Sequence, residues 1–253
     1  MSTLTIKNLT IGKGIPKVIV PLVGKTASDL FEEAKIVNDL NPDVVEWRVD
    51  TYEHVEDLDA VQITLKKIRN ILTKTLILFT FRTHKEGGNK EISHAYYTQL
   101  NEMAISTQNI DLVDVELFNT EEIVTKLVAT AKEHGVFVIM SNHDFAKTPP
   151  KEEIVSRLIK MHEYGAHIPK IAVMPTSVAD VLTLLDATNS MKLKYPDVPI
   201  ITMSMGGTGV ISRLAGELFG SAFTFGAGKA ASAPGQIPAA DLRTVLEIFH
   251  KSM

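Results

Sequence analysis

Eight short apolar runs, rich in β-branched residues, alternate with helical segments along the chain, and this alternation restricts the fold more than any other feature. Strands that alternate with helices favour a parallel sheet, and eight such units are the number that closes a (β/α)8 barrel. A length of 253 residues suits one barrel. We therefore expect an α/β fold, a (β/α)8 TIM barrel that occupies residues 1–253 as a single domain. The runs are residues 17–24, 43–50, 76–82, 112–117, 136–142, 169–175, 199–205 and 221–226.

The segments between the runs show the periodicity and the end signals of helices. Residues 121–134 place their apolar side chains on one helical face. In the helix before the sixth run, Thr148 is the expected N-cap and Pro149 the expected first helical residue. Ahead of the first run, residues 4–14 alternate weakly and end in glycines. We expect them to form a β-hairpin that closes the N-terminal end, or bottom, of the barrel.

Charge and composition exclude several classes of partner. The chain has 30 acidic and 26 basic residues, a net charge of −4 and no basic tract, so nucleic acid is not an expected partner. It has no cysteine, which removes disulfides, thiolate nucleophiles and cysteine-bound metals and is typical of a cytoplasmic protein. Its eight histidines lack the spacing of a metal site. No uncharged apolar stretch of about 18 residues and no signal-peptide pattern occurs, so we expect neither a membrane span nor secretion.

Charged side chains fall on the inner face of the expected barrel. In the second run, Glu46, Arg48 and Asp50 alternate with the apolar residues that would face the helices. Such a set forms either a buried ion-pair network or a substrate site at the C-terminal mouth of the barrel. We favour the substrate site, because arginines and acids recur near the strand ends, where barrel enzymes bind their substrates. The same period of two points four further side chains inward: Arg82, Asp114, Glu116 and Lys170.

Lys170 and His143 are the strongest candidates for catalysis. Lys170 lies in an apolar run, and a desolvated lysine near other cations can act as an amine nucleophile towards a carbonyl group. His143 ends the fifth run, and its ordinary pKa of roughly 6.5 suits proton transfer near neutrality. Alternatively, Asn142, His143 and Asp144 form only a capped turn. Glu86, in the glycine-containing loop after the third run, can reach in to orient the imidazole.

The glycine-rich part of the chain contains two apparent phosphate motifs and one candidate carboxylate site. Residues 226–230 (GAGKA) lack the first glycine and the final Ser or Thr of a phosphate-binding P-loop. Residues 206–210 (GGTGV) can bind phosphate at the start of the following helix, but Arg213 on that helix would serve a carboxylate equally well. Ser232 and Gln236, in the loop after the eighth run, are candidate partners for the hydroxyl groups of a small polar ligand.

Six motifs together resemble the type I 3-dehydroquinate dehydratases, the Schiff-base lyases of the shikimate pathway of aromatic amino acid biosynthesis. The resemblance covers nearly the whole chain from residue 17 onwards. It implies a homodimer of (β/α)8 barrels that uses no metal and no organic cofactor. It also implies that 3-dehydroquinate is the substrate, and that 3-dehydroshikimate and water are the products. The motifs are EWRVD, FTFR…KEGG, MSNHDF, PKIAVMP, SMGGTGVISRLAGELFGSAFTFG and ASAPGQ.

The resemblance implies a role for each candidate side chain. Lys170 would form the imine with the C3 ketone of the substrate. His143 would remove a proton from C2 and then help to expel the C1 hydroxyl as water, while Glu86 holds the imidazole. The residues with binding roles are Glu46, Arg48 and Arg82, which would line the pocket, Arg213, which would bind the substrate carboxylate, and Ser232 and Gln236, which would contact the hydroxyls.

Two other functions stay open at this point. A class I aldolase also uses a barrel lysine imine, but it cleaves a carbon–carbon bond and its substrates often carry phosphate. A non-catalytic barrel that binds a carboxylate metabolite would not need both an inward lysine and a histidine at a strand end. We favour dehydration, because the phosphate motifs are weak and because His143 and Glu86 suit proton transfer.

Overall fold

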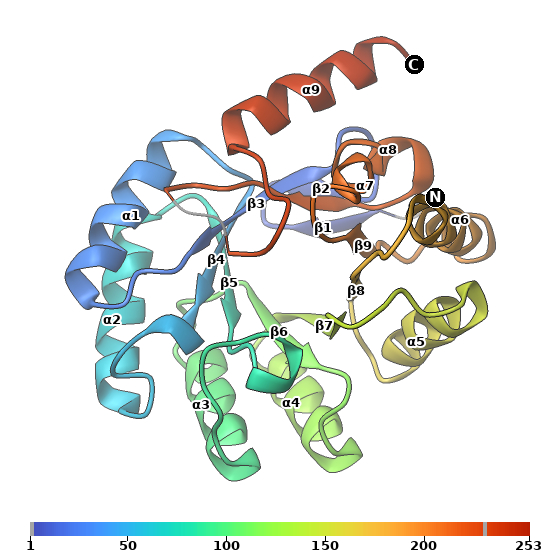
Figure 1. Cartoon of the computed structure of the whole chain (residues 1–253). Helices are drawn as coiled ribbons and strands as arrows, with labels where there is room; N and C mark the ends of the chain where they lie inside the picture. The colour runs from blue at the N-terminus through green and yellow to red at the C-terminus, as the bar shows by residue number, and fades with distance from the viewer. Residues whose placement is uncertain (1–2, 230–231) are drawn as a thin grey trace.

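The computed structural model describes residues 3–229 and 232–253, and its centre is a barrel of eight parallel strands (Figure 1). Neighbouring strands follow the order β10-β3-β4-β5-β6-β7-β8-β9. A parallel bridge between Ile200 and Ser221 joins the two edges, so the sheet nearly closes. The expected (β/α)8 barrel is therefore confirmed. The strands are β3 (Lys17–Leu22), β4 (Val44–Arg48), β5 (Leu76–Thr80), β6 (Leu112–Glu116), β7 (Phe137–Asp144), β8 (Ile168–Val173), β9 (Ile201–Ser204) and β10 (Phe223–Phe225).

Helices connect the strands and cover the outside of the barrel (Figure 1). They are α1 (Ala27–Asp39), α2 (Leu58–Ile71), α3 (His94–Ser106), α4 (Glu121–Glu133), α5 (Lys151–Glu163), α6 (Val178–Lys194), α7 (Val210–Leu214), α8 (Gly216–Phe219) and α9 (Ala239–Lys251), with short 3-10 turns η1 (Val49–Thr51) and η2 (His84–Glu86). Ser, Thr or Asp side chains accept N–H groups of the first turn in α1, α2, α3, α4 and α6, which fixes where these helices begin. Helix α4 buries Val124, Leu127 and Ala131, as its apolar spacing predicts.

Helix α5 begins two residues later than the sequence predicts. It starts at Lys151, and Pro150 is the N-cap residue, with φ of −54° and ψ of 151°. The residue before a proline avoids helical backbone angles, so Pro149 stays outside the helix. The Thr148 hydroxyl donates a hydrogen bond to the carbonyl of Met174 at 3.1 Å instead of capping the helix. The predicted N-cap was therefore wrong.

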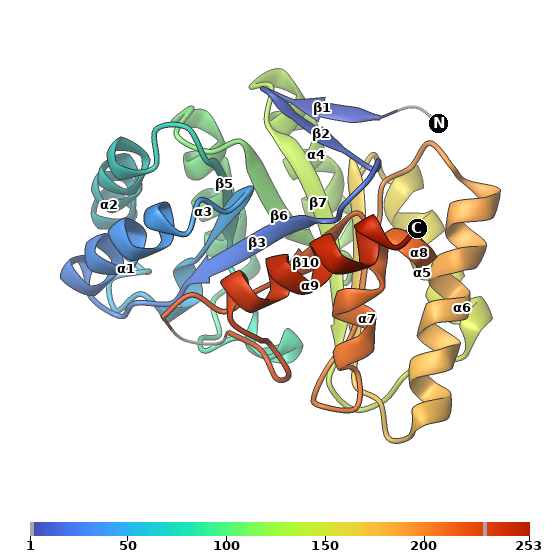
Figure 2. The same ribbon diagram turned by 90° about the horizontal axis from the view of Figure 1, so that it is seen from above.

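The N-terminal hairpin closes the bottom of the barrel, as predicted. Strands β1 (Leu4–Ile6) and β2 (Leu9–Ile11) pair in antiparallel fashion, and Figure 2 shows the hairpin at one end of the barrel. The buried side chains of Ile6 and Ile11 belong to one apolar cluster with inward residues from all eight barrel strands. The members of this cluster near the strand starts, such as Ile19, Val44 and Leu112, fill the N-terminal half of the barrel, so the charged inward residues lie towards the C-terminal ends of the strands.

A second apolar layer lies between the strands and the helices. It contains Trp47, whose ring packs edge to face on Phe79 at 5.7 Å and on Tyr52 at 5.9 Å. Because Trp47 alternates with Glu46 and Arg48 on β4, burial of the indole in this outer layer turns both charged side chains inward. Among the described residues, no helix is long and apolar enough to cross a membrane.

Candidate active site

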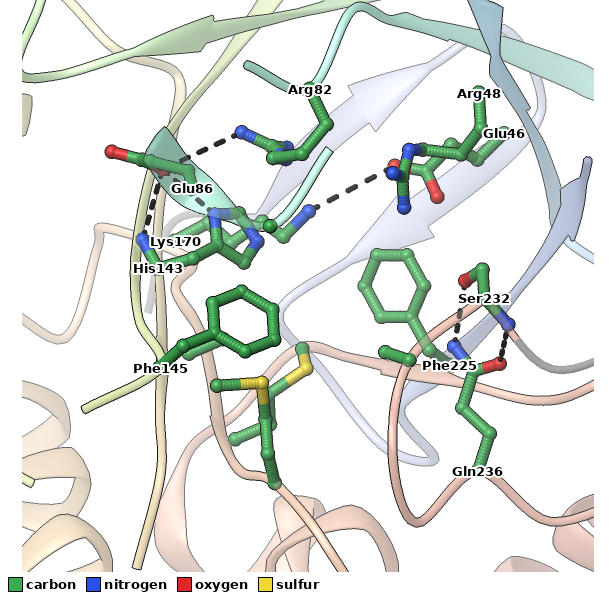
Figure 3. Close-up of a pocket in the computed structure, with 15 residues that line it drawn as sticks. Glu46, Arg48, Arg82, Glu86, His143, Phe145, Lys170, Phe225, Ser232 and Gln236 are labelled. Carbon is green, nitrogen blue, oxygen red and sulfur yellow. Dashed lines mark hydrogen bonds and ion pairs between the residues drawn. The ribbon is translucent and has the colours of Figure 1, made fainter. Parts of the chain in front are cut away.

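A cavity with an empty volume of about 460 Å³ opens at the C-terminal ends of the barrel strands. Eight of the nine predicted site residues line it (Figure 3), and the exception is Arg213, which lies behind the wall. The eight are Glu46, Arg48, Arg82, Glu86, His143, Lys170, Ser232 and Gln236.

Lys170 reaches into this cavity from β8 and is 3% exposed. Its Nζ lies 3.4 Å from Asp114 Oδ2 and 3.9 Å from Glu46 Oε1. The centre of the Phe225 ring lies 4.7 Å from the same atom. Two carboxylates and the face of an aromatic ring therefore compensate the buried positive charge. The sequence left an ion-pair network and a substrate site as alternatives, and the structure shows ion-paired residues that also line the cavity.

Arg82 is the centre of the charge network. Its guanidinium lies 2.8 Å from the Asp114 carboxylate and 2.8 Å from that of Glu116, and it donates to the Ser141 hydroxyl at 2.9 Å. Burial alone would lower the pKa of Arg82, but the neighbouring carboxylates raise it well above its ordinary value. Burial alone would raise the pKa of Asp114, but Arg82 and Lys170 hold it below its ordinary value. Arg82 and Asp114 are therefore both charged at neutral pH.

A bidentate ion pair holds Arg48 at the cavity wall. Its Nε and Nη2 lie 2.8 and 2.9 Å from the two oxygens of Asp50. Asp50 also accepts hydrogen bonds from the backbone N–H groups of Asn89 at 3.1 Å and Arg82 at 3.3 Å. Burial opposes both charges, but their pairing raises the pKa of Arg48 and lowers the pKa of Asp50. Asp50, an inward residue in the sequence pattern, thus anchors a residue of the site.

His143 and Glu86 form a hydrogen-bonded pair in the same cavity as Lys170 (Figure 3). The Nδ1 atom of His143 lies 2.9 Å from Glu86 Oε2, which also accepts a hydrogen bond from the His143 backbone N–H at 2.9 Å. Glu86 ends the η2 turn, and Gly87 follows it with φ of +85°. A Cβ atom at Gly87 would lie 2.3 Å from Cε2 of Phe145. Glycine therefore lets this turn pack against the Phe145 ring and bring Glu86 to the imidazole.

Burial sets the charge state of this pair. Burial and the positive charges of Arg82 and Lys170 lower the pKa of His143 well below its ordinary value, so the imidazole is neutral at pH 7. Burial and the Glu116 carboxylate raise the pKa of Glu86 to about 8, against the lowering effect of Arg82. Hydrogen bonds from N–H donors favour the ionised form of Glu86. Above about pH 8 Glu86 is ionised, and a neutral imidazole whose Nδ1–H faces its carboxylate leaves Nε2 free to accept a proton.

Ser232 and Gln236 lie across the cavity from His143, in the loop after β10 (Figure 3). The Gln236 Oε1 accepts a hydrogen bond from the Ser232 backbone N–H at 2.9 Å, and its Nε2 donates to the Ser232 hydroxyl at 3.1 Å. This mutual contact holds the two side chains together. The cavity therefore has a neutral polar wall opposite the His143–Glu86 pair.

Arg213 on α7 is 1% exposed. Its Nη2 donates to the carbonyl of Pro234 at 2.9 Å, and its Nη1 lies 3.8 Å from the sulfur of Met203, which lines the cavity. Its Nε has no hydrogen-bond partner, and within residues 3–229 and 232–253 no carboxylate lies within ion-pair distance. Burial lowers the pKa of Arg213 to about 10. A buried guanidinium with a free donor and no counter-ion is the arrangement expected of a site that receives an anion.

The apolar part of the cavity wall was missed in the sequence. The alternation of side chains along a strand could have predicted that Met203 and Phe225 point inward, because each lies two residues after an inward apolar residue of its own strand. Phe145 follows the end of β7, and only the fold brings its ring against Gly87. The missed side chains are Phe145, Met203, Met205 and Phe225.

The capped-turn interpretation of residues 142–144 holds for Asp144 alone. Its Oδ1 accepts hydrogen bonds from the backbone N–H groups of Ala146 at 3.1 Å and Lys147 at 3.0 Å. His143 lines the cavity instead. In the part of the chain that the structure describes, no group of three or more His, Cys, Asp or Glu residues is arranged to hold a metal ion.

Comparisons with known proteins agree with the six sequence motifs. Residues 18–253 match the family model of the type I 3-dehydroquinases. The chain is 60% identical over 253 residues to the 3-dehydroquinate dehydratase of Bacillus velezensis, with 100% of both chains covered. It is similar to the crystal structure of the type I 3-dehydroquinate dehydratase from Clostridium difficile with covalently modified comenic acid, with a TM-score of 0.97, 53% identity and 100% of both chains covered. For the 3-dehydroquinate dehydratase from Geobacillus kaustophilus, the TM-score is 0.96 and the identity 40%, over 99% of this chain and 97% of that one. The chain belongs to the type I 3-dehydroquinase family and is an enzyme of the hydro-lyase class.

Proposed function

We propose that this enzyme converts 3-dehydroquinate into 3-dehydroshikimate and water in the shikimate pathway, through an imine on Lys170 and with His143 as acid and base. The observation that carries the proposal is one cavity lined by a buried lysine amine and a neutral imidazole, with a carboxylate on the imidazole Nδ1. A lysine imine withdraws electrons and acidifies the neighbouring C–H, and an imidazole is the common acceptor of such a proton. The names of the relatives support the substrate.

Imine formation takes place at Lys170. The ammonium group releases a proton, and the free amine attacks C3 of the substrate ketone to give a carbinolamine. The carbinolamine oxygen takes up a proton and leaves as water, which gives an iminium cation. The nitrogen then carries its positive charge near Asp114 and Glu46, which lie 3.4 and 3.9 Å from the amine of the free enzyme. These carboxylates stabilise the iminium as they stabilise the ammonium.

His143 then carries a proton from carbon to oxygen. Its Nε2 takes the proton from C2, and the electron pair of that C–H bond moves towards the iminium nitrogen to give an enamine. The C1 hydroxyl leaves as water with the proton from the imidazolium, and the electron pair forms the C1–C2 double bond. Glu86 stabilises the imidazolium between these steps. Hydrolysis of the imine consumes one water and frees the product and Lys170.

The polar wall fits a carboxylate with ring hydroxyls. We assign the substrate carboxylate to Arg213, because burial without a counter-ion among the described residues leaves its guanidinium ready for an anion. This assignment requires the sulfur of Met203, 3.8 Å from Nη1, to give way when substrate binds. The residues assigned to the ring and its hydroxyls are Glu46, Arg48, Arg82, Ser232 and Gln236.

Turnover of 3-dehydroquinate that carries deuterium at C2 tests the proposed reaction. We expect an enone product that has lost one label to solvent and retains every carbon of the substrate, observed by NMR spectroscopy. Two carbon fragments would identify an aldolase. Binding of unchanged 3-dehydroquinate would identify a non-catalytic barrel. Either of these results would overturn the proposal.

We further propose that the enzyme is a cytoplasmic homodimer in which each chain is one barrel domain, as the family resemblance implies. Apolar side chains on α6 support an interface, because Val178 is 67% exposed and Leu182 is 61% exposed. The lack of cysteine supports a reducing compartment. Light scattering coupled to gel filtration should give the mass of two chains, and the mass of one chain would contradict the dimer.

A further inference from the structure

A chain of hydrogen bonds leads from helix α5 to the catalytic pair. Arg157 on α5 donates from Nη1 to Oδ1 of Asn142 at 2.7 Å. The Nδ2 of Asn142 donates in turn to Oε1 of Glu86 at 3.2 Å. The other Glu86 oxygen lies 2.9 Å from Nδ1 of His143 (Figure 3). Three contacts thus connect a guanidinium on the outer helix with the imidazole in the cavity.

Strand alternation explains how Asn142 bridges the two sides of the barrel wall. On β7, His143 lines the cavity, so the side chains before and after it lie on the opposite face. Arg157 contacts both of these neighbours, because its Nη1 also lies 3.8 Å from Asp144 Oδ2. Asn142 is 3% exposed. Its amide is therefore buried between a guanidinium and a carboxylate.

Arg157 dictates which way this amide points. A guanidinium has N–H donors and no acceptor, so Asn142 turns its oxygen towards Arg157 and its NH2 group towards Glu86. Without the guanidinium, the amide is free to turn and to present its oxygen to the carboxylate. Arg157 is itself held by an ion pair with Glu153, one turn earlier on α5, and by the Phe118 ring at 5.4 Å.

We propose that Asn142 and Arg157 are positioning residues that keep Glu86 ionised and thereby keep the imidazole proton of His143 on Nδ1. This inference rests on the proposed function, in which Nε2 of His143 accepts the substrate proton. A protonated Glu86 would donate its O–H to Nδ1, so the imidazole proton would sit on Nε2, which then accepts nothing. One amide donor matters here because burial already pushes Glu86 towards its neutral form.

Charged and titratable groups face Glu86 from each neighbouring element. Arg82, whose Nη1 lies 3.6 Å from Oε2, favours the ionised form, whereas Asp114 and Glu116 on β6 oppose it. His84, on the same turn as Glu86, and His94 on α3 line a second cavity that Glu86 also lines. Arg82 also pairs with the carboxylates of Asp114 and Glu116 on β6. The hydrogen bond from Asn142 Nδ2 therefore stabilises the charge of Glu86 beyond what Arg82 supplies.

The pH profile of kcat/KM tests the proposal in Asn142→Leu and Arg157→Met. Leucine has nearly the shape of asparagine but no donor. We expect the acidic limb of Asn142→Leu to move to higher pH by about one to two units, the pKa equivalent of a hydrogen bond to a charged group. Activity at pH 7 then falls roughly 10- to 100-fold, while the plateau at high pH stays within about threefold. Arg157→Met should shift the limb in the same direction by a smaller amount.

Two matched variants serve as controls. Arg157→Lys keeps a charged donor, so its pH profile of kcat/KM should match that of the parent enzyme. Lys160→Met removes a cation from the same helix, where Lys160 lies over the Tyr164 ring, and should leave the profile unchanged. A purely structural role would lower kcat/KM by the same factor at every pH. That result, or unshifted profiles in both test variants, would overturn the proposal, and Arg157→Met decides alone if Asn142→Leu does not fold.

Borohydride trapping of the Lys170 adduct distinguishes failure of this proposal from failure of the proposed function. A parent enzyme that forms no adduct with 3-dehydroquinate refutes the imine mechanism and the positioning role together. Adducts in the parent and in both variants, combined with unshifted pH profiles, refute the positioning role alone. Adducts in the parent and in both variants, combined with shifted acidic limbs of the pH profiles, support both the imine mechanism and the positioning role.

Discussion

Arg213 and Arg82 are both buried guanidiniums, yet their surroundings predict opposite consequences when each is replaced by methionine. Arg82 lies 2.8 Å from the carboxylates of Asp114 and Glu116. Within the residues that the structure describes, the Arg213 guanidinium contacts only a backbone carbonyl and a thioether sulfur. Methionine keeps an unbranched apolar chain at either position. The pair of substitutions therefore isolates the effect of a counter-ion.

The magnitudes follow from the burial of each charge. Burial lowers the pKa of Arg213 from its ordinary value to about 10, which corresponds to roughly 3 kcal/mol of unfavourable charge burial at 1.36 kcal/mol per pKa unit. Arg213→Met removes that cost and also one hydrogen bond to a charged group, worth roughly 1.5–3 kcal/mol. The free energy of unfolding of the ligand-free protein should therefore stay within about 1.5 kcal/mol of the parent value, on the stabilising side. Arg82→Met leaves buried carboxylates without their partner and should lose about 3–5 kcal/mol.

Substrate binding by Arg213→Met should weaken, although the free protein keeps its stability. Loss of one charge-assisted contact raises the KM of Arg213→Met for 3-dehydroquinate by about 10- to 150-fold. Urea unfolding at pH 7 measures the stability of both variants, and initial rates measure KM. A loss of about 3 kcal/mol or more in Arg213→Met would mean that an anion already neutralises this guanidinium in the free protein. An unchanged KM would mean that the substrate carboxylate binds elsewhere, and either result would refute this interpretation of Arg213.

The kcat/KM of the enzyme should fall as the pH drops below about 8, because protonation of Glu86 then removes the carboxylate that holds the His143 proton on Nδ1. A kcat/KM profile that stays flat from about pH 6 to about pH 9 would contradict this prediction. His143→Ala should still form the borohydride adduct but turn over at least about 100-fold more slowly, and a parent-like rate would remove His143 from the mechanism. Ile11→Ala should lower the free energy of unfolding by about 2–5 kcal/mol in urea titrations and leave kcat unchanged, because the hairpin lies at the opposite end of the barrel. A folded Ile11→Ala enzyme with a much lower kcat would show that the hairpin supports the site directly.

The sequence was most informative where a strand has a strict period of two. On β4, an indole on one face requires charged neighbours on the other, so Trp47 alone predicts that Glu46 and Arg48 point inward. The same reasoning applies to Lys170 on β8, which the structure places in the cavity. Strand ends carry chemistry in a closed barrel, so this periodicity led directly to four residues of the cavity, which are Glu46, Arg48, Arg82 and Lys170.

The rest of the site depends on distances that no local pattern contains. Arg213 was expected in the cavity, but α7 holds it behind the side chain of Met203. Asn142 and Arg157 are 15 positions apart, and only the packing of α5 on β7 brings the guanidinium to the amide. Each of these contacts joins two elements whose relative position is set by the whole barrel.

The most direct test of the imine mechanism is intact-mass spectrometry of the protein mixed with 3-dehydroquinate and borohydride, followed by peptide mapping. The mechanism predicts one ligand-sized adduct on the peptide that contains Lys170, none in Lys170→Met, and full labelling in Lys126→Met, where the replaced lysine is exposed and pairs with Glu102. Consumption of 3-dehydroquinate without an adduct, or an adduct on another residue, would contradict the imine at Lys170.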